Sequence, residues 1–175
     1  MRRVPAPPDL PAVRRSGFTL LEVAVVAILI IMLAGIVVPQ FQGALEEAQT
    51  NGTRQMLERV RTAVEYYAFQ HDQELPGGSG GFWSAQIFLD QLMLATDLDG
   101  DTAPVGTPGF PFGPYLTDDI GPNPFNDLAT VKLVGPGEAM GAPDDETGWV
   151  FFAETGAFRA NTAAAGHEGV AIWEL

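Results

Sequence analysis

The stretch R-R-S-G-F-T-L-L-E-V-A-V-V-A-I-L-I-I-M-L-A-G-I-V-V, from Arg14 to Val38, decides how the rest of the chain is interpreted. No charged side chain occurs after Glu22 in this stretch. The 21 residues from Phe18 to Val38 span roughly 30 Å as a helix, which is the thickness of a bilayer core. A domain of 175 residues cannot enclose so uniformly apolar a helix. The sequence therefore predicts a membrane-spanning helix over residues 18–38.

Charge is distributed unevenly around this segment. Residues 1–17 hold four arginines and one aspartate, whereas residues 18–175 hold 5 basic and 21 acidic side chains. Because basic residues stay on the cytoplasmic side of a membrane, the N-terminus is predicted to be cytoplasmic and the acidic body exported. So acidic a body repels phosphate backbones, which argues against nucleic-acid binding. The chain has no cysteine, so disulfides and thiolate metal sites are excluded.

Three interpretations of the apolar segment have to be compared. A secretory signal is cut after its apolar region behind small residues, and Met32 at the nearest such site, Met32-Leu33-Ala34, fits poorly. A plain anchor fits the length and the charge but gives no reason for Glu22, since a carboxylate at the edge of a lipid span is costly. The third interpretation is a segment that is processed ahead of its apolar run.

The stretch from Arg14 to Val23 resembles the processing site of type IV prepilins and type II secretion pseudopilins. In that family an aspartyl membrane peptidase cuts after a glycine and then methylates the new terminal amine. The resemblance implies cleavage between Gly17 and Phe18, with Phe18 N-methylated. It also implies that Glu22 pairs with the amine of a neighbouring subunit in a filament, and it places Pro39 where many members carry a proline.

The residue types in this motif have physical reasons of their own. Gly17 lacks a side chain, so the backbone around it can extend into a protease cleft. Arg14 and Arg15 hold the leader on the cytoplasmic face. A buried carboxylate at Glu22 is tolerable when it is paired and costs about 3–5 kcal/mol when it is alone. The alternative for Glu22 is a side chain that reaches the membrane interface without a partner.

Beyond the apolar segment the helical pattern resumes. Pro39 is predicted to bend or locally melt the helix, because proline removes one backbone hydrogen bond. Apolar residues at steps of three and four predict that an amphipathic helix continues to about residue 74, packs on a globular head and ends before Pro76. His71 extends this stripe and is interpreted as a core-edge or surface residue rather than a ligand. The stripe comprises Phe41, Ala44, Leu45, Ala48, Leu57, Val60, Val64, Tyr67 and Ala68.

The predicted fold class is α+β, a long N-terminal helix packed on a small antiparallel sheet, as in type IV pilin-like proteins. A short helix is expected over 82–94, strands over 130–134, 148–152 and 157–160, and an edge strand over 170–173. The loop over 113–126 and the hairpin over 148–161 also resemble those of major pseudopilins. The predicted organisation is a leader at 1–17, a membrane and filament-core helix at 18–38, its amphipathic continuation at 39–76, and a periplasmic head at 77–175.

An acidic loop follows the short helix. Asp97, Asp99 and Asp101 alternate as at the start of a calcium loop, but Gly100 and Pro108 stand at the wrong positions for an EF-hand. A looser calcium site and an acidic turn both remain open. No cofactor other than calcium is suggested, and the calcium motif of major pseudopilins is not evident.

No catalytic constellation stands out, so the chain is predicted not to be an enzyme. Ser79 and Ser84 lack a nucleophile-elbow context, and His167 has no partner at metal-ligand spacing. An anchored periplasmic hydrolase would need carboxylates or histidines that converge in the head. The sequence does not single out such a group.

The resemblance implies a structural subunit of a type II secretion pseudopilus, which a prepilin peptidase processes in the inner membrane. Implied partners are further copies in a helical filament, minor pseudopilins and the inner-membrane assembly platform. A pilin of a type IV pilus is the alternative, and a membrane-anchored domain that does not polymerise is a third hypothesis. The intact Glu22 and the modest size favour a major over a minor subunit, whereas the secreted cargo is left open.

Overall fold

The structure is a computed structural model that describes residues 17–175, with the backbone alone described for residues 38–40. The predicted leader therefore lies outside the described residues, except for Gly17. The chain divides into two compact units, residues 1–41 and residues 42–175. Each unit is considered by itself below.

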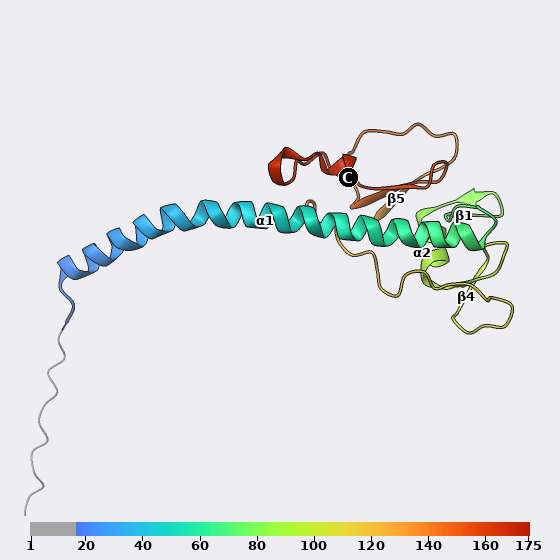
Figure 1. The fold of residues 1–175 in the computed structure, drawn as a ribbon, viewed down its shortest axis with the longest axis horizontal. Coiled ribbons are helices and arrows are strands. Elements are labelled where there is room, and N and C mark those ends of the chain that lie inside the picture. Colours follow the sequence, from blue (N-terminus) through green and yellow to red (C-terminus); the bar gives the residue numbers. More distant parts are fainter. Residues whose placement is uncertain (1–16) are drawn as a thin grey trace, which may run out of the picture. The chain divides into compact units, whose positions relative to one another are not determined.

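Helix α1 runs from Leu20 to Gln70 and is the element with which the described chain begins (Figure 1). The helix continues through Pro39 without a break, so the predicted local melting does not occur. The predicted bend at Pro39 stays a prediction. Among the described residues, α1 is the helix long and apolar enough to cross a membrane. None of the side chains in its most apolar window is buried. That part of α1 consequently has no packing partner within the described chain.

The second half of α1 supplies one wall of the core. Leu57, Val60, Val64 and Tyr67 are each no more than 3% exposed, which confirms the predicted stripe from Leu57 onward. The earlier part of the prediction is wrong, because Phe41 and the side chains at 44, 45 and 48 are exposed. Side chains of α1 become buried from residue 50, where loop residues of the head first cover the helix.

Helix α1 ends at Gln70, a few residues before the predicted end. Beyond it the amide of Gln73 donates a hydrogen bond to the carbonyl of Ala68 at 2.8 Å. Asp72 and Gln73 adopt left-handed backbone angles, with φ of 51° and 72°. Aspartate tolerates this region, whereas a longer side chain such as glutamine is strained in it.

We predict that Gln73→Gly stabilises the unit of residues 42–175 by about 0.5–1 kcal/mol, because glycine adopts positive φ without steric cost. The matched control is Glu65→Gly on the exposed face of α1, which is expected to cost about 1 kcal/mol. Urea unfolding followed by tryptophan fluorescence would measure both. A loss of stability in Gln73→Gly would contradict the assignment of strain to this residue.

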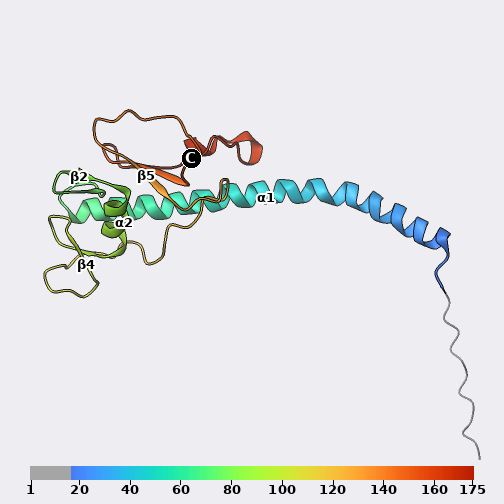
Figure 2. The same ribbon diagram turned by 180° about the vertical axis from the view of Figure 1, so that it is seen from behind.

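The head begins with short elements and ends with the principal sheet. The hairpin β1–β2 precedes helix α2, whose N-cap Ser84 accepts a hydrogen bond from the amide of Ile87 at 3.2 Å. In both views the principal sheet lies along one side of the second half of α1, and the segment with β4 lies along the other (Figures 1 and 2). The bounds are β1 Gly78–Ser79, β2 Phe82–Trp83, α2 Ala85–Met93, β3 Ala95–Thr96, β4 Thr102–Ala103, β5 Val131–Val134, β6 Trp149–Phe152 and β7 Ala157–Ala160.

The principal sheet has the order β5-β6-β7, so the three strongest strand predictions are confirmed. Strands β6 and β7 form the predicted antiparallel hairpin, with Trp149 opposite Ala160. Strand β5 pairs parallel to β6, with Val131 opposite Trp149, so this sheet is mixed. A parallel pair requires a crossover of about a dozen residues or more, and residues 135–148 supply it. The fold class is confirmed, and the expectation that every pairing is antiparallel is wrong for this pair.

Aromatic side chains fill the space between α2 and the sheet. The rings of Phe88 and Phe151 stack with centroids 4.3 Å apart, and those of Trp149 and Phe158 lie 5.6 Å apart. All four are fully buried. The indole nitrogen of Trp149 donates to the carbonyl of Gly121 at 2.9 Å, which satisfies its polar atom inside the core.

The C-terminal residues form two short 3-10 turns, η1 His167–Gly169 and η2 Ile172–Glu174, instead of the predicted edge strand. Gly169 has a φ of 75°, which interrupts an extended run. Ile172 is fully buried. The backbone of this segment pairs at one isolated antiparallel bridge, between Ala165 and Ala171. Side chains bind its last carbonyls, since Arg159 donates to that of Trp173 and Arg61 to that of Leu175.

Candidate processing and assembly site

The residues predicted to be processed lie next to one another, directly ahead of α1. Gly17 and Phe18 precede the helix in an exposed, non-helical stretch, and Phe18 is 84% exposed. Nothing lies within 4 Å of the position of a Cβ added at Gly17. The peptide bond between the two residues is therefore sterically open.

Thr19 and Glu22 cap the start of α1 reciprocally. The amide of Glu22 donates to Oγ1 of Thr19 at 3.2 Å, and the amide of Thr19 donates to Oε2 of Glu22 at 3.3 Å. This is a capping box, in which two otherwise unpaired amides of the first turn find acceptors. A carboxylate in the first turn also interacts favourably with the helix dipole.

The role of Thr19 was missed by the sequence reasoning, although the signal was present. A threonine followed three residues later by a glutamate, just before an apolar run, is the usual sequence pattern of a capping box. Glu22 thus has a partner within its own chain. Its carboxylate lies one helical turn from the bond predicted to be cut.

Pro39 is described in its backbone alone, so no side-chain role is assigned to it. It lies within α1, which continues beyond it.

The three aspartates of the acidic loop do not converge. Oδ1 of Asp97 accepts hydrogen bonds from the amides of Asp99 and Asp101 at 3.1 and 3.0 Å, which closes the turn. The carboxylate of Asp101 accepts one from the hydroxyl of Ser79 at 3.3 Å. Across residues 17–175 as described, no three His, Asp or Glu side chains are grouped to hold a metal ion. The acidic-turn interpretation accounts for these contacts, and no calcium site is assigned.

His71 lies in an aromatic cluster at the end of α1. Its ring stacks on Tyr67 with centroids 3.8 Å apart, and Phe112 approaches edge-on at 5.3 Å. Its Nδ1 lies 2.8 Å from the carbonyl of Tyr67, so Nδ1 donates and carries the proton. Burial raises the pKa of the Tyr67 hydroxyl. His71 is therefore a packed core residue, more buried than the predicted core-edge position.

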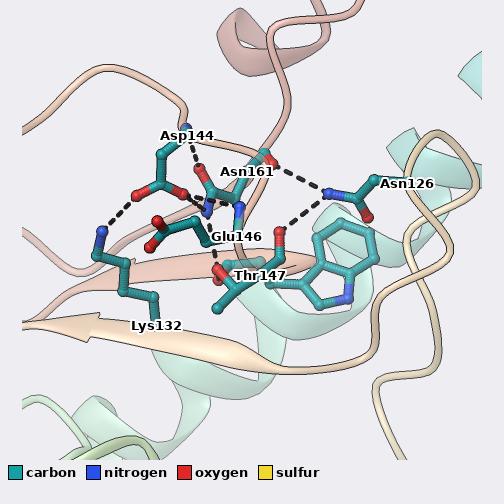
Figure 3. Close-up of polar contacts among 7 residues, drawn as sticks. Asn126, Lys132, Asp144, Glu146, Thr147 and Asn161 are labelled. Carbon is teal, nitrogen blue, oxygen red and sulfur yellow. Dashed lines mark hydrogen bonds and ion pairs between the residues drawn. The ribbon is translucent and has the colours of Figure 1, made fainter.

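A polar network that the sequence did not reveal ties the crossover loop to the sheet (Figure 3). Asp144 pairs with Lys132 of β5 and accepts a hydrogen bond from Nδ2 of Asn161 at 2.6 Å. Nδ2 of Asn161 also donates to Oγ1 of Thr147 at 2.8 Å, and Asn126 donates to the carbonyl of Thr147 at 3.0 Å. Contacts that join residues far apart in the sequence cannot be found from local patterns.

We predict that this network weakens in acid. The hydrogen bond from Lys132, followed by that from Asn161, lowers the pKa of Asp144 to about 2 from an ordinary 3.8. A depressed pKa means that the contribution of Asp144 to stability is fully present above about pH 4 and is lost as the pH falls through about 2. The difference in unfolding free energy between wild type and Asp144→Asn is expected to shrink over that range. Urea unfolding at several pH values would measure it, and a difference that does not change with pH would contradict the prediction.

Together, the fold and the N-terminal motif define a class of protein. A long N-terminal helix with an exposed apolar half, joined to a small sheet that packs on its second half, is the arrangement of type IV pilin-like proteins. The glutamate in the first turn of that helix is in keeping with the class.

A sequence comparison finds a relative of known name. The chain is 29% identical over 141 residues to the type II secretion system core protein G of Escherichia coli (strain K12). The alignment covers 78% of this chain and 92% of that protein. No family model and no solved structure matches the chain. The chain is therefore similar, over most of its length, to a core protein of the type II secretion system.

Proposed function

We propose that the chain is a structural subunit of a type II secretion pseudopilus rather than an enzyme. In this proposal a prepilin peptidase cuts between Gly17 and Phe18 and methylates the amine of Phe18. The subunit waits in the inner membrane with its N-terminus in the cytoplasm and its head in the periplasm. It is then polymerised through residues 18–38 by the assembly platform, together with minor pseudopilins, and the filament drives protein export.

One observation carries this proposal most directly. The first part of α1 is long and apolar enough to cross a membrane, and none of its most apolar window is buried in the described chain. Lipid can cover such a surface before assembly, and the same helix of neighbouring copies can cover it afterwards. A membrane anchor that also serves as a polymer interface needs such an apolar surface, left uncovered by its own chain.

The exposed side chains of Phe41 and Leu45 extend the apolar surface beyond the predicted membrane segment. We infer that filament contacts continue past residue 38 into the start of the amphipathic helix. The proposal otherwise keeps the predicted division of the chain into a leader at 1–17, a membrane and filament-core helix at 18–38, its amphipathic continuation at 39–76 and a head at 77–175.

The capping box offers a physical sequence of events for Glu22. Before assembly, its carboxylate is satisfied by the amide of Thr19 within the same helix. Inside a filament the carboxylate leaves the membrane–water interface and becomes buried. It then needs an opposite charge nearby, because an unpaired buried charge is costly. The amine created at Phe18 supplies that charge from a neighbouring copy.

The intact mass and N-terminal sequence of the chain, extracted from inner membranes with and without the peptidase, test this function. The expected product begins at a methylated Phe18 when the peptidase is present and retains the leader when it is absent. Gly17→Leu is the matched variant and is expected to stay uncut. A chain that begins near Gly35, or one that is unaffected by the peptidase, would overturn the proposed processing.

A further inference from the structure

Most basic side chains of the head have partners in their own chain. Lys132 pairs with Asp144. Arg59, Arg61 and Arg159 donate to backbone carbonyls, namely those of Asp119, Ile120, Phe158, Trp173 and Leu175.

Arg54 differs from these four cations. It is exposed on α1, and no hydrogen bond or ion pair joins it to any part of the chain that the structure describes. It belongs to a body that carries 21 acidic and 5 basic side chains. A single unengaged guanidinium on so acidic a surface is available to an acidic site outside its own chain.

A cavity of about 430 Å³ lies at the C-terminal end of α1, and we call it the terminal cavity. Its wall combines aromatic and apolar side chains with carboxylates, and it has no lysine or arginine among the described residues. The side chains that define it are Tyr67, Trp83, Leu98, Asp72, Glu74 and Asp99.

A buried nitrogen without a partner lies in the wall of the terminal cavity. His71 lines it and is 1% exposed. Because Nδ1 carries the proton toward the carbonyl of Tyr67, Nε2 is left as an acceptor. Nε2 has no partner among the described residues. Nε2 is itself buried, so the acceptors that the cavity exposes are the carboxylates of Asp72, Glu74 and Asp99. Together with the aromatic faces they match a donor-rich cation.

An arginine side chain fits this chemistry. Its aliphatic stem packs on apolar and aromatic surface, while its planar guanidinium stacks on rings and pairs with carboxylates. Arg54 cannot enter the cavity of its own chain, since the rise of α1 from residue 54 to residue 71 separates them by roughly 25 Å. A second copy displaced by that distance along the helix axis can present Arg54 to the cavity.

We propose that Arg54 of one copy binds in the terminal cavity of the next copy, between Trp83 and the carboxylates of Glu74 and Asp99. The contact joins two different surfaces, so it repeats in one direction and builds a filament instead of closing a dimer. This inference rests on the proposed function and specifies one contact between the heads of neighbouring subunits.

Charge reversal in the full chain tests the contact. Arg54→Glu and Glu74→Lys are each expected to lower the yield of sheared filaments about tenfold, because each places like charges together. The double variant Arg54→Glu/Glu74→Lys restores opposite charges and is expected to recover most of the yield. Both positions are exposed, and the unfolding midpoint of each variant shows whether the head still folds.

Chemical cross-linking gives a second measurement. The chain has no cysteine, so Arg54→Cys/Glu74→Cys carries the only two thiols. A short bis-maleimide is expected to link the filaments that this variant forms into ladders. The control, Arg54→Cys/Asp127→Cys, places its second thiol on an exposed residue outside the cavity and is expected to give no ladder.

The outcomes separate this inference from the function on which it depends. If wild-type chain forms no filament, the proposed function fails and this contact fails with it. If wild-type filaments form but the reversed charges have no effect, or the ladder is absent, the contact is wrong and the function stands. If Glu74→Lys blocks export while Arg54→Glu assembles normally, the cavity takes a cation from another protein and the contact is likewise overturned.

Discussion

Glu22→Ala is expected to lower the incorporation of the chain into filaments about a hundredfold or more, because an unpaired buried charge costs about 3–5 kcal/mol. In this variant the amine of Phe18 on a neighbouring copy loses its carboxylate. The head is expected to stay folded, since the side chain of Glu22 is exposed and its hydrogen bond is to Thr19. Immunoblots of sheared filaments would measure incorporation.

Alanine at this position removes two interactions at once, so a matched variant is needed to separate them. Glutamine can still accept a hydrogen bond from the amide of Thr19, because either glutamate or glutamine can occupy this position of a capping box. Glu22→Gln therefore keeps the cap and removes the charge. It is expected to assemble as poorly as Glu22→Ala, and assembly at the wild-type level would show that the charge is not what the filament requires.

The converse variant tests the cap alone. Thr19→Val keeps the shape of the side chain but removes the hydroxyl that accepts a hydrogen bond from the amide of Glu22. It is expected to cost about 1 kcal/mol at the start of the helix. Assembly of Thr19→Val is expected to fall far less than that of Glu22→Gln. The reverse order would mean that the capping box, and not the charge pair, limits assembly.

Gly148→Ala is expected to destabilise the head by about 3 kcal/mol. Gly148 lies directly before β6, and a Cβ added there would overlap the backbone carbonyl of Leu128. The neighbouring backbone is fixed, because Gly148 donates to Thr130 and its carbonyl accepts from the side chain of Asn123 at 2.9 Å. The carbonyl of Leu128 is held as well, because it accepts a hydrogen bond from the amide of Asn123 at 2.9 Å, and it cannot move aside without breaking this bond.

The crossover loop supplies the matched control for this glycine. A Cβ added at Gly141 meets no atom within 4 Å, and this residue is exposed. Gly141→Ala is expected to change stability by no more than about 0.5 kcal/mol. Urea unfolding of the full chain in detergent, followed by tryptophan fluorescence, to which buried Trp149 contributes, would compare the two variants. Equal stabilities would contradict the predicted backbone overlap.

Local patterns in the sequence determined a large part of the structure. The apolar run and the stripe from Leu57 to His71 predicted α1, since the helical period is a property of neighbouring residues. The hairpin over 148–161 was predicted in the same way from two apolar strands that flank a tight turn. The motif from Arg14 to Val23 is also made of contiguous residues, and the processing that it predicts stays a prediction. Thr19 belongs with these, since its capping partner lies three residues away.

Only the tertiary structure decided how distant segments meet. The parallel pairing of β5 with β6 depends on where the crossover loop returns the chain, which no alternation of side chains specifies. The network around Asp144 and Asn161 joins residues 17 positions apart. The exposure of Leu45 follows from where the head stops covering α1. The sequence by itself determined the main helices and strands, because they depend on adjacent residues, and cleavage at the contiguous motif from Arg14 to Val23 stays a prediction. The pairing of the sheet, the cavity at the end of α1 and the unengaged Arg54 depend on contacts between distant residues, which only the folded chain establishes.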